Sequence, residues 1–145
     1  MVMRSTAHTT WEGDLVSGSG VTSLASGAAG PLPVTWSSRT EMPEGRTSPE
    51  ELLAAAHATC FSMALSHGLA EAGTPPSRLE TDVVSTFEQT DAGFRITSMA
   101  ITVGGEVPGI DRAAFEEAAT AASEGCPVSQ ALKGNVDITL SATLL

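Results

Sequence analysis

A long apolar helix, predicted from Ser48 to about Glu71, limits the possible folds more than any other segment. Ser48 can cap this helix, Pro49 suits the first helical position, and Glu51 can complete a capping box. Small and apolar residues occupy most faces of the segment, which reads ELLAAAHATCFSMALSHGLAEA. A helix that is apolar on more than one side should be buried at the centre of a domain or in a subunit interface.

The rest of the chain alternates strand patterns with turn signals. Before the long helix, the expected strands are Ala7–Trp11, Val21–Ala25 and Val34–Arg39, followed by a loop at Glu41–Ser48. After it, we expect a hairpin of two strands, Leu79–Glu88 and Phe94–Val103. Two helices should follow, one capped by Asp111 and ending near Ser123, and a short one from Cys126-Pro127 to Leu132. The last expected element is a strand at Val136–Leu144. This order predicts an α+β fold with a mainly antiparallel sheet. No repeat or composition break marks a second domain, so we expect one domain over residues 1–145.

Composition narrows the function classes. A net charge of −10, from 7 basic and 17 acidic side chains, argues against a nucleic-acid partner. The first dozen residues lack the apolar core of a secretory signal, and the apolar run Leu52–Leu65 is too short to span a bilayer, so we expect no membrane association and a cytoplasmic location. Because that compartment keeps thiols reduced, the two cysteines are expected to be reactive groups, metal ligands or core packing.

Cys60 lies about three turns into the long helix. A thiol in apolar surroundings has a raised pKa and is normally inert, and the helix dipole fades within the first turn. A reactive Cys60 therefore needs a cation from elsewhere in the chain. Among the seven basic residues, Arg39 is the first candidate and Arg46 the second. Without such a cation, simple core packing is the more frequent role of a helical cysteine.

Cys126 precedes Pro127 at the expected start of the short helix, where backbone N–H groups should favour its thiolate. It could also simply replace a capping serine. His57, three residues before Cys60, could be a base, a metal ligand or a core histidine bonded to a carbonyl oxygen. A zinc site built from His57 and the two cysteines would be one ligand short.

Glu50 precedes Cys60 by ten helical residues, which separates them by ~15 Å along the helix axis. Direct contact within one chain is therefore not expected. If both belong to one site, either a long arginine bridges them or two subunits contribute. Otherwise Glu50 is a favourable negative charge at a helix N-terminus.

The segments SPEELLAAAHATCFSMALS (48–66) and GCPVSQALK (125–133) resemble the OsmC/Ohr family of thiol peroxidases, and are closer to its OsmC branch. The segments HTTWEGD (8–14), DAGF (91–94) and VPGID (107–111) also fit OsmC, so the resemblance covers almost the whole chain.

This resemblance implies a cysteine peroxidase for peroxide stress defence, preferring organic hydroperoxides to hydrogen peroxide. Cys60 would be the peroxidatic thiol, which the peroxide oxidises to a sulfenic acid. Cys126 would be the resolving thiol, which reacts with this sulfenic acid to form a Cys60–Cys126 disulfide. Arg39 would hold the thiolate, and Glu50 would hold Arg39. The family fold is an intertwined homodimer, with the sheet wrapped around central long helices.

The resemblance also implies that no metal, haem or flavin cofactor is required and that a small or lipoyl thiol restores the dithiol. Phe61, Met63 and Phe94 are apolar residues that would favour alkyl or lipid hydroperoxides. One alternative is a non-catalytic module that binds an apolar ligand and uses its cysteines as core packing; another is a structural zinc site.

Overall fold

The computed structural model describes residues 1–145. Internal contacts divide the chain into two compact units, Met1–Leu52 and Leu53–Leu145. The expected single domain over residues 1–145 stays a prediction.

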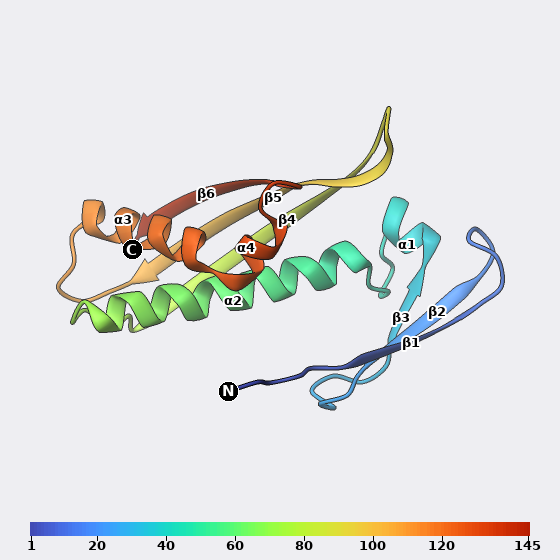
Figure 1. Cartoon of the computed structure of the whole chain (residues 1–145), viewed down its shortest axis with the longest axis horizontal. Coiled ribbons are helices and arrows are strands. Elements are labelled where there is room, and N and C mark those ends of the chain that lie inside the picture. Colours follow the sequence, from blue (N-terminus) through green and yellow to red (C-terminus); the bar gives the residue numbers. More distant parts are fainter. The chain divides into compact units, whose positions relative to one another are not determined.

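The first unit contains a three-stranded antiparallel sheet in the order β1-β2-β3, drawn in blue to cyan in Figure 1. Its strands are β1 (Ala7–Glu12), β2 (Ser19–Leu24) and β3 (Leu32–Thr35). In the turn between β1 and β2, the carboxylate of Asp14 accepts hydrogen bonds from the backbone N–H groups of Val16 and Ser17. The first two strands agree with the expected ones to within two residues.

The predicted strand Val34–Arg39 is wrong in its second half, because α1 (Trp36–Thr40) follows β3 directly. Thr35 caps α1: its hydroxyl accepts a hydrogen bond from the backbone N–H of Ser38, whose hydroxyl accepts one from the N–H of Thr35. This reciprocal capping overrides the β propensity of the segment. Arg39 therefore lies on a short helix and not at the end of a strand.

The long helix α2 (Pro49–Glu71) has the predicted bounds and continues from the first unit into the second. The hydroxyl of Ser48 accepts from the backbone N–H of Glu51 at 3.1 Å, as a cap should. The Glu51 carboxylate, however, accepts from the hydroxyl of Thr47 at 2.6 Å instead of closing the capping box. At the other end, Gly73 has a φ of +81°, a conformation that glycine adopts without strain.

The full length of α2 bears on the expectation that this segment is too short to span a membrane. With 23 residues, the helix is long and apolar enough to cross a membrane by length and composition alone, whereas the apolar run Leu52–Leu65 within it is too short. A mostly buried core helix passes the same test, but only 22% of the most apolar stretch of α2 is buried within one chain. Phe61, Leu65 and Leu69 of α2 do lie in the hydrophobic core of the second unit.

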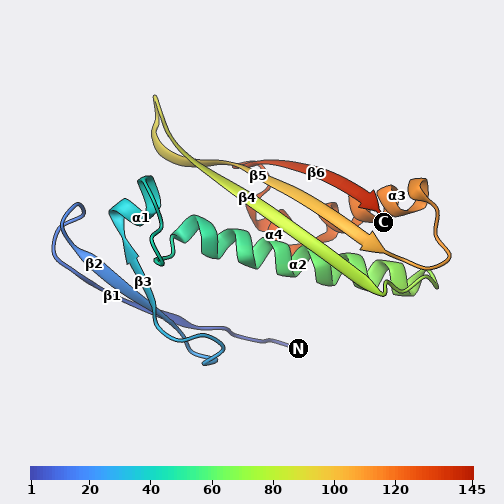
Figure 2. The same cartoon turned by 180° about the vertical axis from the view of Figure 1, so that it is seen from behind.

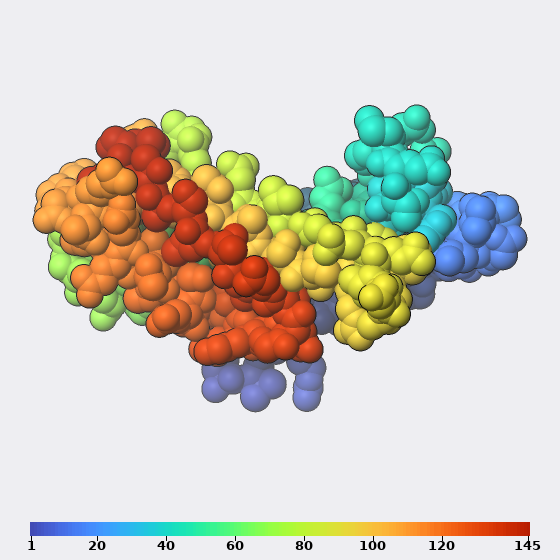
Figure 3. Space-filling view, turned by 90° about the horizontal axis from the view of Figure 1, so that it is seen from above, coloured from blue at the N-terminus to red at the C-terminus, as the bar shows by residue number.

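The second unit is built on a three-stranded sheet in the order β4-β5-β6. Its strands are β4 (Arg78–Thr90), β5 (Gly93–Glu106) and β6 (Asp137–Leu144). The first two form the predicted antiparallel hairpin, whereas β6 pairs with β5 in parallel. The helices α3 (Arg112–Gly125) and α4 (Pro127–Leu132) connect β5 to β6, and Figure 3 shows β6 in dark red at the surface. The sheets of the chain are thus mainly antiparallel, with one parallel pair.

The core of the second unit lies between the sheet and its helices, and Figures 1 and 2 show α2 and α3 beside the strands. Met99, Ile101 and Val103, which alternate along β5 and so share one of its faces, are all buried. Phe115 of α3 is fully buried against the same strand. A Cβ atom on Gly105 would lie only 2.5 Å from its ring, so the glycine allows the close approach of strand and helix.

Candidate active site

The second unit brings the two thiols together. Cys60 lies in α2, and Cys126 separates α3 from α4, as the C-cap of one helix and the N-cap of the other. Both are free thiols, and Cys60 packs against the core cluster that contains Cys126. Each thiol shifts the pKa of the other. Cys126 is fully buried, whereas Cys60 is half-buried. Two neighbouring free thiols can form a disulfide after a small rearrangement.

Several donors favour the thiolate of Cys126. Burial alone would raise its pKa, but hydrogen bonds from the Ser129 amide, the Cys60 thiol, the Ser129 hydroxyl and the Val128 amide outweigh burial. The pKa of Cys126 is therefore lowered, which agrees with the thiolate expected at the start of the short helix.

The pKa of the Cys60 thiol is shifted in the opposite direction, upward. Burial raises the pKa of the Cys60 thiol, and the hydrogen bond and negative charge of Cys126 raise it further, against a single lowering hydrogen bond from the Val128 amide. In the second unit by itself, the first proton therefore leaves Cys126. A cation supplied from beyond this unit is needed if Cys60 is to ionise first, in line with the sequence argument.

The first unit holds the main candidate for that cation. Arg39 Nε donates to the two carboxylate oxygens of Glu50 at 3.0 and 3.1 Å, and Nη2 donates to Oε1 at 2.7 Å. Glu50 is only 6% exposed. The guanidinium carbon also lies 5.8 Å from the centre of the Trp36 ring. The second candidate, Arg46, is exposed and forms a looser pair with Glu44 at 3.7 Å.

His57 extends the thiol pair into the interior of the second unit. The ring is fully buried, and its Nε2 lies 2.7 Å from the hydroxyl oxygen of Ser129, which is 4% exposed. Burial lowers the pKa of His57, so the ring is neutral at neutral pH. The core-histidine interpretation expected a carbonyl partner and not a hydroxyl. Sequence reasoning missed Ser129, although its position three residues after the capping Cys126 was a usable signal.

The structure thus forms two groups from the candidate residues: Cys60 with Cys126, His57 and Ser129 in the second unit, and Arg39 with Glu50 in the first. No group of three or more His, Cys, Asp or Glu side chains is placed to hold a metal ion.

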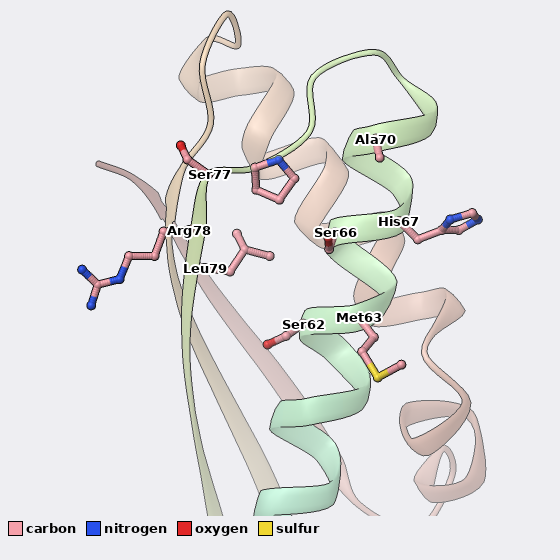
Figure 4. A pocket seen from close by; sticks show the side chains of 9 residues that line it. Ser62, Met63, Ser66, His67, Ala70, Ser77, Arg78 and Leu79 are labelled. Atoms are coloured by element: carbon pink, nitrogen blue, oxygen red, sulfur yellow. The ribbon is translucent and has the colours of Figure 1, made fainter.

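An open groove lies between α2 and β4 in the second unit (Figure 4). Ser62, Met63, His67 and Arg78 are among its lining residues, and neither cysteine is. Met63 is 69% exposed, but Phe61 is fully buried in the core. Phe61 therefore stabilises the fold, and the expectation that it contacts a substrate is not supported.

The chain is similar in sequence and in fold to known proteins. Residues 42–141 match the family model described as OsmC-like protein. The chain is 42% identical over 138 residues to the peroxiredoxin OsmC of Escherichia coli K12, covering 95% of this chain and 96% of that protein. It is 38% identical over 95 residues to the organic hydroperoxide resistance protein OhrB of Bacillus subtilis, covering 65% and 68%. The crystal structure of that OhrB aligns with a TM-score of 0.76 at 28% identity, covering 95% of this chain and 98% of the other.

Proposed function

The chain belongs to the OsmC-like protein family, and from this premise we propose that it is a cysteine-based peroxidase that reduces organic hydroperoxides to alcohols. The observation that carries the proposal is the pair of neighbouring free thiols, Cys60 and Cys126, each of which shifts the pKa of the other. The names of the relatives, a peroxiredoxin and an organic hydroperoxide resistance protein, supply the substrate class.

In the first step, the thiolate of Cys60 attacks the terminal oxygen of the hydroperoxide. A sulfur–oxygen bond forms, the oxygen–oxygen bond breaks, and the departing alkoxide takes up a proton to leave as an alcohol. Cys60 becomes a sulfenic acid. The guanidinium of Arg39 stabilises the Cys60 thiolate and the charge on the departing oxygen, and Glu50 holds that guanidinium in place.

In the second step, the sulfur of Cys126 attacks the sulfur of Cys60. The disulfide forms, the sulfur–oxygen bond breaks, and hydroxide leaves as water with the proton that Cys126 has lost. The lowered pKa of Cys126 supports its part as this second nucleophile. Disulfide formation protects Cys60 from irreversible oxidation, and an external small dithiol of the dihydrolipoyl type then restores both thiols.

The working form in this proposal is a homodimer acting in peroxide stress defence in the cytoplasm. Only 22% of the most apolar stretch of α2 is buried in a single chain, which leaves apolar surface for a second subunit to cover. Two free cysteines fit a reducing compartment.

The test compares hydroperoxide consumption by the parent protein and two variants, using cumene hydroperoxide and a dithiol reductant. Cys60→Ser should abolish turnover, because no sulfenic acid can form. Cys126→Ser should consume about one equivalent and then stall. Mass spectrometry of the parent after one equivalent should show a Cys60–Cys126 crosslink. Full activity of Cys60→Ser, or a parent whose free thiols are unchanged by the peroxide, would refute the proposal.

A further inference from the structure

We propose that His57 and Ser129 are positioning residues for the resolving thiol: the His57 ring holds the Ser129 hydroxyl so that its single hydrogen points at the sulfur of Cys126. The inference rests on the proposed peroxidase function for its kinetic consequence. Its structural content, a three-member hydrogen-bonded chain from α2 to Cys126, can be tested without any peroxide.

The first argument concerns the hydroxyl of Ser129. Its oxygen lies 2.7 Å from Nε2 of His57. Ser129 is also the third residue of the helix that Cys126 caps, and its hydroxyl contributes to the lowered pKa of the Cys126 thiol. A hydroxyl has one hydrogen to donate and two lone pairs to accept with. If Ser129 gave its hydrogen to His57, it would have none for Cys126 and could not stabilise a thiolate there. Donation to Cys126 therefore requires that His57 be the donor to Ser129.

The second argument concerns the His57 ring. Its other nitrogen, Nδ1, is buried and has no hydrogen-bond partner. A buried N–H without an acceptor is rarer in proteins than an unpaired acceptor, so the hydrogen of the neutral ring belongs on Nε2. This tautomer donates to Ser129, as the first argument requires. The two arguments start from different atoms and reach the same arrangement.

The chain His57 Nε2–H to Ser129 Oγ–H to Cys126 Sγ is enclosed in the protein. All three side chains are at most 4% exposed, so water does not compete for these hydrogen bonds. The titratable groups facing the sulfur of Cys126 are Cys60 from α2 directly and His57 from α2 through Ser129. The expected consequence is a Cys126 that loses its proton more readily and forms the disulfide faster.

The first experiment follows the ultraviolet absorbance of the Cys126 thiolate against pH in a Cys60→Ser background. Ser129→Ala and His57→Phe should move the titration midpoint upward by about one pH unit, because the thiolate loses a hydrogen bond. His57→Gln should return the midpoint toward that of the parent, since its amide nitrogen can replace Nε2 as the donor. Ser62→Ala is the matched control: its hydroxyl is bonded to Thr81 at 2.7 Å, away from the thiols, and the midpoint should not move.

An unchanged midpoint in Ser129→Ala would overturn the proposal. So would equal shifts in His57→Phe and His57→Gln, which would reduce His57 to a packing role. Circular dichroism confirms that each variant is folded before it is titrated, and His57→Gln keeps the test decisive if the bulkier phenylalanine disrupts the core.

The second experiment separates the two chemical steps in protein that retains both cysteines. One equivalent of cumene hydroperoxide is mixed rapidly with the parent, Ser129→Ala or His57→Phe, and dimedone traps the sulfenic acid. Disulfide formation should be about tenfold slower in the two variants than in the parent, when each rate is compared with peroxide consumption by the same protein. Equal rates of disulfide formation would contradict the inference. A parent that consumes no hydroperoxide would instead refute the proposed function and leave the titration result standing.

Discussion

Arg39 is held on two sides within the first unit. Three hydrogen bonds join it to the buried carboxylate of Glu50, and the ring of Trp36 lies beside its guanidinium. Hydrogen bonds from two guanidinium nitrogens to one carboxylate fix both the position and the plane of the guanidinium. A lysine, with a single ammonium group, could not reproduce this arrangement. The two thiols are held differently, by backbone amides and by one another. The arginine can therefore be perturbed through Glu50 without changing the thiol pair.

We expect Glu50→Gln to lower the rate constant for hydroperoxide consumption by about 10- to 100-fold, since charge-assisted hydrogen bonds contribute roughly 1.5–3 kcal/mol. Arg46→Gln is the control, because that exposed arginine forms only a loose ion pair and should be replaceable without loss. Stopped-flow consumption of cumene hydroperoxide gives both rate constants. A Glu50→Gln variant as fast as the parent would show that Arg39 does not depend on this carboxylate.

Sequence motifs identified the residues of the thiol site better than they identified the residues around it. Cys60 and Cys126 stand out because cysteine is rare in this chain and each has a specific motif. Ser129 does not stand out, because a serine in a short helix is common and usually faces water. Its proposed role depends on His57, 72 residues away, which only the folded chain brings within 2.7 Å of the Ser129 hydroxyl.

At the scale of single elements, β5 shows where local propensity and packing disagree. The expected strand ends at Val103, before two glycines, and glycine is a poor strand former. It continues to Glu106 because Gly104 and Gly105 still pair with β4 and β6. Glycine is required at position 105 for another reason, the ring of Phe115 that lies against it.

The neighbouring glycines give a matched pair of tests. Gly105→Ala should lower the free energy of unfolding by about 1–3 kcal/mol, because the new methyl group would lie 2.5 Å from the Phe115 ring. Gly104→Ala should be neutral or slightly stabilising, since its methyl group would meet only the exposed side chain of Leu145, at 3.2 Å. Urea denaturation measures both. Equal effects would mean that the contact with Phe115 does not limit the packing of β5.

At the scale of the whole molecule, the exposed apolar surface of α2 is the feature that a single chain leaves unexplained. The helix is apolar on most faces, yet only 22% of its most apolar stretch is buried. Met63, near its middle, is 69% exposed. A second subunit covering this surface would remove the unfavourable contact with water.

We therefore expect the parent protein to have twice the mass of one chain in multi-angle light scattering. Met63→Asp should shift it toward the monomer at low micromolar concentration, because a carboxylate would be buried without a partner. Ala113→Asp, on the exposed side of α3, is the control and should leave the mass unchanged. A monomeric parent, or a Met63→Asp variant that remains a dimer, would contradict this arrangement.

The sequence by itself determined the features whose causes lie within a few residues of one another. The bounds of α2, the β4–β5 hairpin, the helix cap at Asp111 and the break at Cys126 all follow from local capping, turn and alternation rules. Only the tertiary structure decided the contact between the two thiols, the opposite directions of their pKa shifts and the chain from His57 through Ser129. Burial and hydrogen bonding depend on which distant segments pack together, and no local pattern encodes that.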